Sequence, residues 1–284
     1  MVLESCQWLQ PSAAGREKTL MWSLLLLLPA LVTPAKPVTV LNIIQRSVQA
    51  NDADWASAPQ YDHIETDYGN GGTKTYAVVM LDGSPYQRLI ELNGEPLSPA
   101  QAAAELQKLD LAIAARRNES AEQRADRILK FEKDRNRDHL FMLQMTSAFN
   151  FQLVGQQRLG ARDVYVLRAT PRPGYQPPNF QARALTGMEG MLWIDKATFQ
   201  WVKVEAQVIR PVTIAGFLAQ VEPGTRFELE KAPVSAGIWL PKHFAMQVRA
   251  KILFFVNHIS REDQSFFSYR PASKVDPKSF SDQQ

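Results

Sequence analysis

The stretch Phe244-Ala-Met-Gln-Val-Arg-Ala-Lys-Ile-Leu-Phe-Phe-Val256, FAMQVRAKILFFV, alternates between two kinds of side chain almost without a break. Successive side chains of a β-strand point to opposite faces, so this period of two predicts one long strand, or a strand with a bulge, that has an apolar face and a wet face. Strands of this kind are typical of antiparallel sheets, whereas parallel strands read as continuous apolar runs. The stretch therefore predicts an antiparallel sheet.

Two segments before this stretch, Val202–Val208 and Arg226–Glu230, alternate in the same way. A third strand, ending at Asp195, precedes them. The residues Asp195-Lys-Ala-Thr198 predict a tight turn, because an aspartate side chain accepts hydrogen bonds from backbone N–H groups further along the chain. A catalytic acid would need a partner base, and the nearest candidate, Glu205, lies well along the return strand. We therefore interpret Asp195 as a turn residue.

The first third of the chain has three more alternating segments, at residues 61–68, 74–81 and 86–93. The turns Gly69-Asn-Gly-Gly72 and Asp82-Gly-Ser-Pro85 separate them. This order of strands and turns predicts a meander.

Helix signals lie on both sides of this meander. Apolar residues recur at helical spacing from Val38 to Ala50, with Asn51-Asp52 as the expected stop. Ser98-Pro-Ala-Gln101 and Ser120-Ala-Glu-Gln123 read as capping boxes that open two further helices. The predicted helices of this middle block are Ala102–Arg117, a second from the box at Ser120 to about Arg135, and a third over Asp138–Met145.

The order of these elements, strands then helices then many strands, predicts an α+β fold in which a few helices cover a large antiparallel sheet. No Gly/Ser linker, composition break or internal repeat divides the sequence. We therefore expect a single domain over residues 36–284.

The N-terminus has the build of an export signal. An apolar run from Leu20 to Thr33 follows Arg16 and Lys18 and is shorter than a membrane-spanning helix. We interpret residues 1–35 as a signal peptide, with an uncleaved anchor as the alternative, and expect a periplasmic protein. The one cysteine, Cys6, precedes the run, so the mature chain would have no disulfide and no thiol nucleophile.

Composition and motifs argue against several functions. The chain of 284 residues carries a net charge of +3 and no dense block of Lys and Arg, so nucleic acid is not expected as a partner. The four histidines show no zinc-ligand spacing, and no nucleophile elbow or phosphate-binding loop occurs. We expect no catalytic residue, no metal and no cofactor.

Three structural motifs resemble one family. The pattern Gly190-x-Leu-Trp-Ile-Asp195, then Val202-Lys-Val204, then Gly237-Ile-Trp-Leu-Pro241 before the long strand resembles the Lol-type outer-membrane lipoprotein carriers. It is closest to exported bacterial proteins described as outer-membrane lipoprotein-sorting proteins. The resemblance covers about Val38 to Tyr269 and implies a curved, unclosed antiparallel half-barrel, helices that lid an apolar concave face, and an acyl chain as ligand. The long helical block Ser98–Phe149 departs from the carriers.

Bulky, soft apolar residues are concentrated on the predicted strands. Methionines and aromatic residues can line an adaptable acyl-chain pocket, although they also fill ordinary cores. The candidate lining residues are Met191, Trp193, Trp201, Phe244, Met246, Val248, Ile252 and Phe254.

These observations lead to two hypotheses. The first is a monomeric, non-enzymatic periplasmic protein that binds or carries the acyl chain of a lipid or an acylated lipoprotein. The second is an envelope-assembly or structural protein with a filled core, which uses the same fold to dock a protein partner. The two differ in whether an apolar cavity exists.

Overall fold

The computed structural model describes residues 38–69, 71–179, 182–214, 219–252 and 256–272, without the side chains of residues 138 and 141. These residues belong to one compact unit that begins at Val38. The expected signal segment, residues 1–35, and the candidate Phe254 lie outside the described residues. Within the described ranges, no helix combines the length and the apolar character needed to span a bilayer.

The chain order of the elements agrees with the α+β prediction. The helices are α1 (Val40–Ser57), η1 (Ala58–Gln60), α2 (Pro99–Arg117), α3 (Ala121–Ala148) and η2 (Ala182–Gly187). The strands are β1 (Tyr61–Gly69), β2 (Gly72–Leu81), β3 (Ser84–Leu92), β4 (Glu95–Pro96), β5 (Phe149–Leu159), β6 (Arg162–Pro171), β7 (Met188–Asp195), β8 (Trp201–Val208), β9 (Val212–Ile214), β10 (Ala219–Val221), β11 (Arg226–Ser235), β12 (Ile238–Ile252) and β13 (Val256–Pro271).

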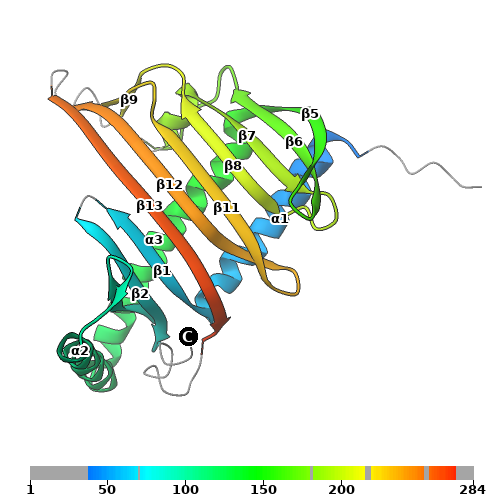
Figure 1. Cartoon of the computed structure of the whole chain (residues 1–284). Coiled ribbons are helices and arrows are strands. Elements are labelled where there is room, and N and C mark those ends of the chain that lie inside the picture. The colour runs from blue at the N-terminus through cyan, green and yellow to red at the C-terminus, as the bar shows by residue number, and fades with distance from the viewer. Residues whose placement is uncertain (1–37, 70, 180–181, 215–218, 253–255, 273–284) are drawn as a thin grey trace, which may run out of the picture. The chain divides into compact units, whose positions relative to one another are not determined.

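These strands form one antiparallel sheet of 13 strands in the order β4-β3-β2-β1-β13-β12-β11-β8-β7-β6-β5, with β10 pairing β12 and β9 pairing β10 (Figure 1). Its two ends, β4 and β5, do not pair with each other, so the described sheet is not closed into a barrel. The predicted fold class, a large unclosed antiparallel sheet with a few helices, is confirmed. The predicted meander is β1 to β3.

The last strand occupies an inner position. β13 pairs with β1 from Tyr61↔Pro271 to Asp67↔Gln264 and with β12 from His243↔Ser265 to Ile252↔Val256. It therefore connects the β1–β4 part of the sheet to the part that runs from β12 to β5.

One face of the sheet carries the main core. The cross-strand row Leu167–Leu192–Val204 is almost fully buried, and α1 adds Ile43 and Ile44 to the same cluster. α1 contacts β5 and β12, and α3 contacts β3 and β5, so both helices run across the strands (Figure 1). We call this side of the sheet the helix face and the opposite side the open face.

The first helix is longer than the sequence predicts. α1 continues through Asn51 and Asp52, the expected stop, to Ser57. Contacts with the sheet extend the helix, because the side chains of Asn51 and Asp54 are buried and bind residues of the strands. The Asn51 amide donates to the Ser47 carbonyl and its oxygen accepts from Lys231 Nζ at 2.8 Å. Local helix-stop signals are weak against such contacts.

Asp54 is the centre of this buried polar cluster. Its carboxylate forms an ion pair with Lys231, accepts from the backbone N–H of Trp239 at 2.8 Å, and accepts from Gln200 Nε2 at 3.0 Å. Burial raises the pKa of Asp54 and lowers the pKa of Lys231, while their mutual attraction opposes both changes. The cluster ties α1 to β11, to β12 and to the residues just before β8.

The helical block differs from the prediction in one respect. The two expected helices after Ser120 are a single helix, α3, of 28 residues. No glycine or proline lies between Arg135 and Asp138, so nothing in the backbone ends the helix there. Both capping boxes are confirmed, with the Ser98 and Ser120 side chains accepting from the backbone N–H of Gln101 and Gln123.

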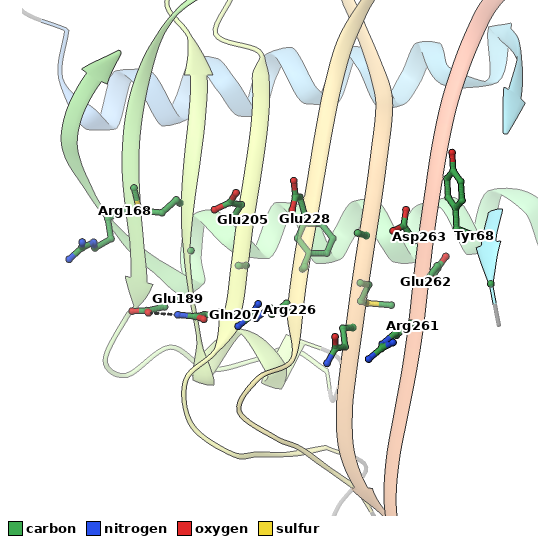
Figure 2. Close-up of a pocket in the computed structure, with 18 residues that line it drawn as sticks. Tyr68, Arg168, Glu189, Glu205, Gln207, Arg226, Glu228, Arg261, Glu262 and Asp263 are labelled. Atoms are coloured by element: carbon green, nitrogen blue, oxygen red, sulfur yellow. Dashed lines mark hydrogen bonds between the residues drawn. The ribbon is translucent and has the colours of Figure 1, made fainter. Parts of the chain in front are cut away.

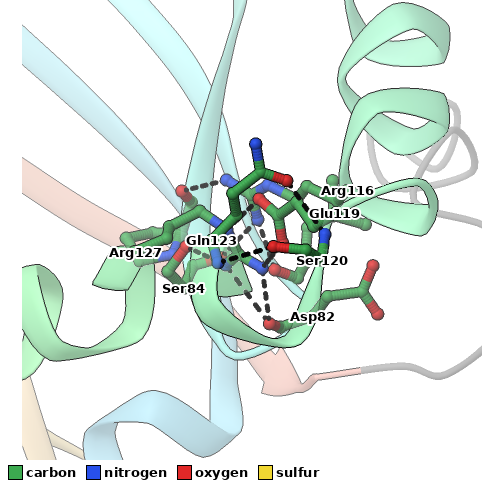
Figure 3. A network of polar contacts seen from close by, with 9 residues as sticks. Asp82, Ser84, Arg116, Glu119, Ser120, Gln123 and Arg127 are labelled. Atoms are coloured by element: carbon green, nitrogen blue, oxygen red, sulfur yellow. Dashed lines mark hydrogen bonds and ion pairs between the residues drawn. The ribbon is translucent and has the colours of Figure 1, made fainter. Parts of the chain in front are cut away.

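The junction of α2 and α3 is clamped onto the turn between β2 and β3 (Figure 3). Arg127 binds both Glu119 oxygens at 2.7 Å and also donates to the Asp82 carbonyl and to Ser84 Oγ. Arg116 donates to the carbonyls of Leu81, Ser84 and Pro85. Two arginines thus hold the junction of α2 and α3 to the backbone carbonyls of this hairpin.

The Asp195 turn is also confirmed. Asp195 Oδ1 accepts from the backbone N–H of Ala197 and Thr198 and from the Thr198 hydroxyl at 2.8 to 3.0 Å. The side chain is almost fully buried and also lies 3.4 Å from Arg162. Its oxygens therefore hold the connection from β7 to β8.

Candidate functional site

An apolar strip crosses β11 and β12 on the helix face. Leu229 pairs with Phe244 and Phe227 pairs with Met246, and Leu229 also pairs with the buried Val204, which places the set on the helix face. The rings of Phe227 and Phe244 meet edge to face, 5.4 Å apart. We define the apolar strip as Phe227, Leu229, Phe244, Met246 and Val248.

All five side chains of the apolar strip are only half-buried, although they lie on inner strands of the sheet. By contrast, the neighbouring row on β6 to β8 is fully covered, because Leu167, Leu192 and Val204 are each 2% exposed or less. An incompletely covered apolar surface of this kind is a common mark of a ligand or partner site.

The eight candidate lining residues do not share one surface. Phe244, Met246 and Val248 belong to the apolar strip, and Trp201 lies in the main core, paired with Ile194. Ile252 is 40% exposed near the end of β12.

Met191 and Trp193 lie on the open face, where they pair with Glu205 and Lys203. The prediction that they line one surface with Phe244 is therefore wrong. Both alternate along β7 with the buried Leu192 and Ile194, so they point to the opposite face. Conversely, Phe227 and Leu229 were missed as site residues, although their alternation with charged residues was a readable signal.

A groove of about 950 Å³ lies along the sheet on the open face (Figure 2). Figure 2 shows its labelled side chains in two rows across the strands. The register gives the same rows, the first through Arg168, Met191, Glu205, Glu228, Ala245 and Asp263 and the second through Glu189, Gln207, Arg226, Gln247 and Arg261.

The first row of the groove is acidic and internally paired. Lys203 lies 2.8 Å from Glu205 and 2.8 Å from Glu228. Burial alone would lower the pKa of Lys203, but the hydrogen bonds to these two carboxylates outweigh burial and raise it. At the other end of the row, His243 Nε2 lies 3.0 Å from Asp263.

The second row is basic and largely unpaired. Arg226 and Arg261 flank Gln247 on neighbouring strands, and both are exposed. Within the described part of the chain, neither guanidinium makes a hydrogen bond or an ion pair, in contrast to Lys203. This basic row is suited to meeting an anionic group.

An acidic rim borders the apolar strip on the side of β13 and β1. Glu262 pairs with Met246, and Gln264 Nε2 donates to Glu65 and Asp67, each at 3.0 Å. Burial raises the pKa of Glu262, and so does repulsion from Asp67 and Glu65. Burial also raises the pKa of Asp67, where repulsion from Glu65 adds to it and the bond from Gln264 opposes it. Among the described residues, no group of three or more His, Cys, Asp or Glu is placed to hold a metal ion.

Replacing Asp67 with asparagine is expected to stabilise the protein at pH 7. A raised carboxyl pKa contributes stability below the unfolded value of 3.8, and this contribution is lost as pH rises through the folded pKa. Asparagine keeps an oxygen for Gln264 and removes the charge. For this partly exposed group we expect about 0.5 kcal/mol in urea unfolding at pH 7 and no gain near pH 3.

Glu95→Gln, at an exposed acid on β4, is the control for this substitution and should change stability at neither pH. A stabilisation of the Asp67→Asn variant that is equal at the two pH values would contradict the electrostatic explanation.

Comparison with known proteins identifies fold neighbours only. No protein-family model matches the chain, and none of the curated proteins matches it in sequence. Among solved structures, an outer-membrane lipoprotein-sorting protein domain from Vibrio parahaemolyticus matches with 11% identity and a TM-score of 0.28, over 84% of this chain and 97% of that one. A LolA superfamily protein from Nitrosomonas europaea matches with 12% identity and a TM-score of 0.30, over 86% and 98%.

The MucA/MucB complex of Pseudomonas aeruginosa matches with 12% identity and a TM-score of 0.23, over 82% of this chain and 98% of that one. The matched structures thus include the group of proteins that the sequence motifs resemble. At these identities and TM-scores the matches do not indicate what this chain binds.

Proposed function

We propose that this chain is a non-enzymatic binding protein that holds the acyl chain of a lipid or an acylated lipoprotein against the apolar strip. The observation that carries the proposal is the half-buried state of Phe227, Leu229, Phe244, Met246 and Val248 on inner strands of the sheet. We further propose that residues 1–35 act as a signal peptide and that residues 36–284 work as a monomeric domain in the periplasm.

The hydrophobic effect is sufficient for this role. Burying an acyl chain stabilises the complex by about 0.8 kcal/mol for each methylene removed from water. A chain of roughly a dozen methylenes would supply about 10 kcal/mol, from which a cost of association of at least about 4 kcal/mol is subtracted, so the binding is weak. Such binding needs no covalent step and stays reversible, as a carrier requires.

The acidic rim restricts the head group of the ligand. Glu65, Asp67 and Glu262 border the strip, and their ionised forms repel an anion. A free fatty acid would place its carboxylate against this rim if its chain lay along the strip. An acyl chain in an ester or amide linkage, as in a glyceride or an acylated protein, avoids this repulsion.

The first test is native mass spectrometry of the protein purified from a periplasmic extract without detergent. The proposal predicts a stoichiometric adduct of lipid mass and uptake of an uncharged naphthylamine dye. A clean apo mass together with no dye uptake would contradict an acyl-chain site and favour a filled core.

Met246→Asp is expected to weaken dye and lipid binding by more than about tenfold, because it places a charge in the apolar strip next to Glu262. The readout is dye fluorescence titrated against protein concentration. Gln247→Asp is the matched control, since it is the next residue of the same strand and its side chain lies on the open face between Arg226 and Arg261. Equal losses in the two variants would contradict the assignment of the strip.

A second candidate function is the docking of a protein partner in the groove of the open face. The unpaired basic row favours it, because Arg226 and Arg261 would match an acidic segment of a partner. The same two variants separate the functions. Gln247→Asp should weaken partner binding and leave dye binding intact, whereas Met246→Asp should do the reverse.

A further inference from the structure

The β12–β13 hairpin projects beyond its neighbours in the sheet. β11 pairs with β12 only as far as Arg226↔Gln247, and β1 pairs with β13 only as far as Asp67↔Gln264. Beyond these points the two strands pair with each other up to Ile252↔Val256. The short strand β10 lies beside β12 there, and Figure 1 shows the paired ends of β12 and β13 extending past β1. We call residues 248–252 and 256–261 the projecting end.

The projecting end exposes large aliphatic side chains. Ile252 is 40% exposed, Val256 is 49% exposed and Ile259 is 59% exposed. Ile252 and Val256 pair directly and share one face, while Ile259 pairs with Arg249 on the other face. Apolar side chains therefore face solvent on both sides of the hairpin.

The charges of this region have one sign. The projecting end carries three basic residues, Arg249, Lys251 and Arg261, and no Asp or Glu. Arg249 and Arg261 lie on the same face as Ile259, and within the described residues neither guanidinium is paired. Lys251 lies 3.5 Å from Glu222, so its charge is partly compensated.

We infer that the projecting end docks the protein on an anionic membrane surface. Exposed aliphatic side chains gain by leaving water for the interfacial region of a bilayer, and arginines beside them attract anionic lipid phosphates. A protein partner would not require apolar groups on both faces of a hairpin, whereas a bilayer surrounds whatever enters it. This inference does not depend on the proposed acyl-chain site, because the projecting end lies outside the apolar strip except for Val248, which the variants leave unchanged.

The test is co-sedimentation of the protein from a periplasmic extract with vesicles of two compositions. One is phosphatidylcholine alone and the other is phosphatidylcholine with phosphatidylglycerol at three to one. Two variants alter the projecting end, Ile252→Ser/Ile259→Ser and Arg249→Gln/Arg261→Gln. Matched controls place the same changes on exposed helix positions, Leu111→Ser/Leu129→Ser and Arg117→Gln/Arg124→Gln.

We expect the wild type to bind the anionic vesicles at least tenfold better than the neutral ones, with affinity falling as salt rises. The arginine variant should lose about tenfold on anionic vesicles, since each basic residue near such a surface adds a few-fold to affinity. The isoleucine variant should lose binding to both vesicle types. The helix controls should bind like the wild type.

Three results would overturn the inference: no binding of the wild type to either vesicle, equal binding to both, or equal losses in the projecting-end variants and their helix controls. Circular dichroism checks that each variant is folded. Dye binding in the same variants tests the apolar strip separately, so failure of one proposal is distinguishable from failure of the other.

Discussion

Asp54→Leu is expected to lower the free energy of unfolding by about 3–5 kcal/mol, because it removes one partner of a buried ion pair. The Lys231 ammonium would lose its counter-ion, and the Trp239 N–H and the Gln200 amide would lose an acceptor that lies 2.8 to 3.0 Å away. The measurement is urea unfolding followed by circular dichroism, compared with Lys231→Met and with the double variant. The double variant should be less destabilised than the sum of the two single variants, because it leaves no buried charge uncompensated.

The Asp54→Leu variant should also recover stability as pH rises. Burial lowers the pKa of Lys231 below its unfolded value of 10.5, so the unfolded state binds this proton more tightly than the folded state. The stability contributed by such a group is present above the unfolded pKa and is lost as pH falls through the folded pKa. Without Asp54 to oppose this effect, the destabilisation should be smaller at pH 9 than at pH 7. A loss that does not change over this range would contradict an unpaired buried ammonium as its cause.

Leu192→Ala is expected to destabilise the protein by about 2–5 kcal/mol, because it leaves a cavity in the main core that its neighbours fill only in part. Leu192 is 2% exposed and lies between Leu167 and Val204 in the sheet. The control is the same change at Leu129, a residue of α3 that is 66% exposed. There the loss should stay within about 0.5 kcal/mol. Similar losses at both positions would mean that the core is placed wrongly.

The sequence predicts those parts of the fold that rest on local signals. The period of two from Phe244 correctly predicts a strand as far as Ile252, where β12 ends, but Val256 begins the next strand and pairs with Ile252. The capping boxes at Ser98 and Ser120 describe interactions within a few residues, and both agree with the structure. The Asp195 turn is of the same kind, since its hydrogen bonds reach only to Thr198.

Contacts between distant residues explain the failures. α1 runs past Asn51 because Asp54 meets Lys231, which lies far along the chain and gives no local signal. Met191 and Trp193 alternate along β7 with Leu192 and Ile194, and only the pairing of β7 with distant strands shows that their face is the open one, away from Phe244. For the same reason the apolar strip could be predicted in part, through Phe244, Met246 and Val248, while its partners Phe227 and Leu229 were not assigned to it.

The inner position of β13 has a consequence for folding. β1 forms near the start of the described chain, yet its neighbour opposite β2 is the final strand, so the pairing Tyr61↔Pro271 closes a loop that spans nearly the whole domain. Closing long loops costs chain entropy before any contact offsets it, so folds rich in such pairs form slowly. Until β13 is present, the β1–β4 segment has no strand through which to join the rest of the sheet. Truncation before Val256 would split the sheet into two separate pieces rather than shorten it at one edge.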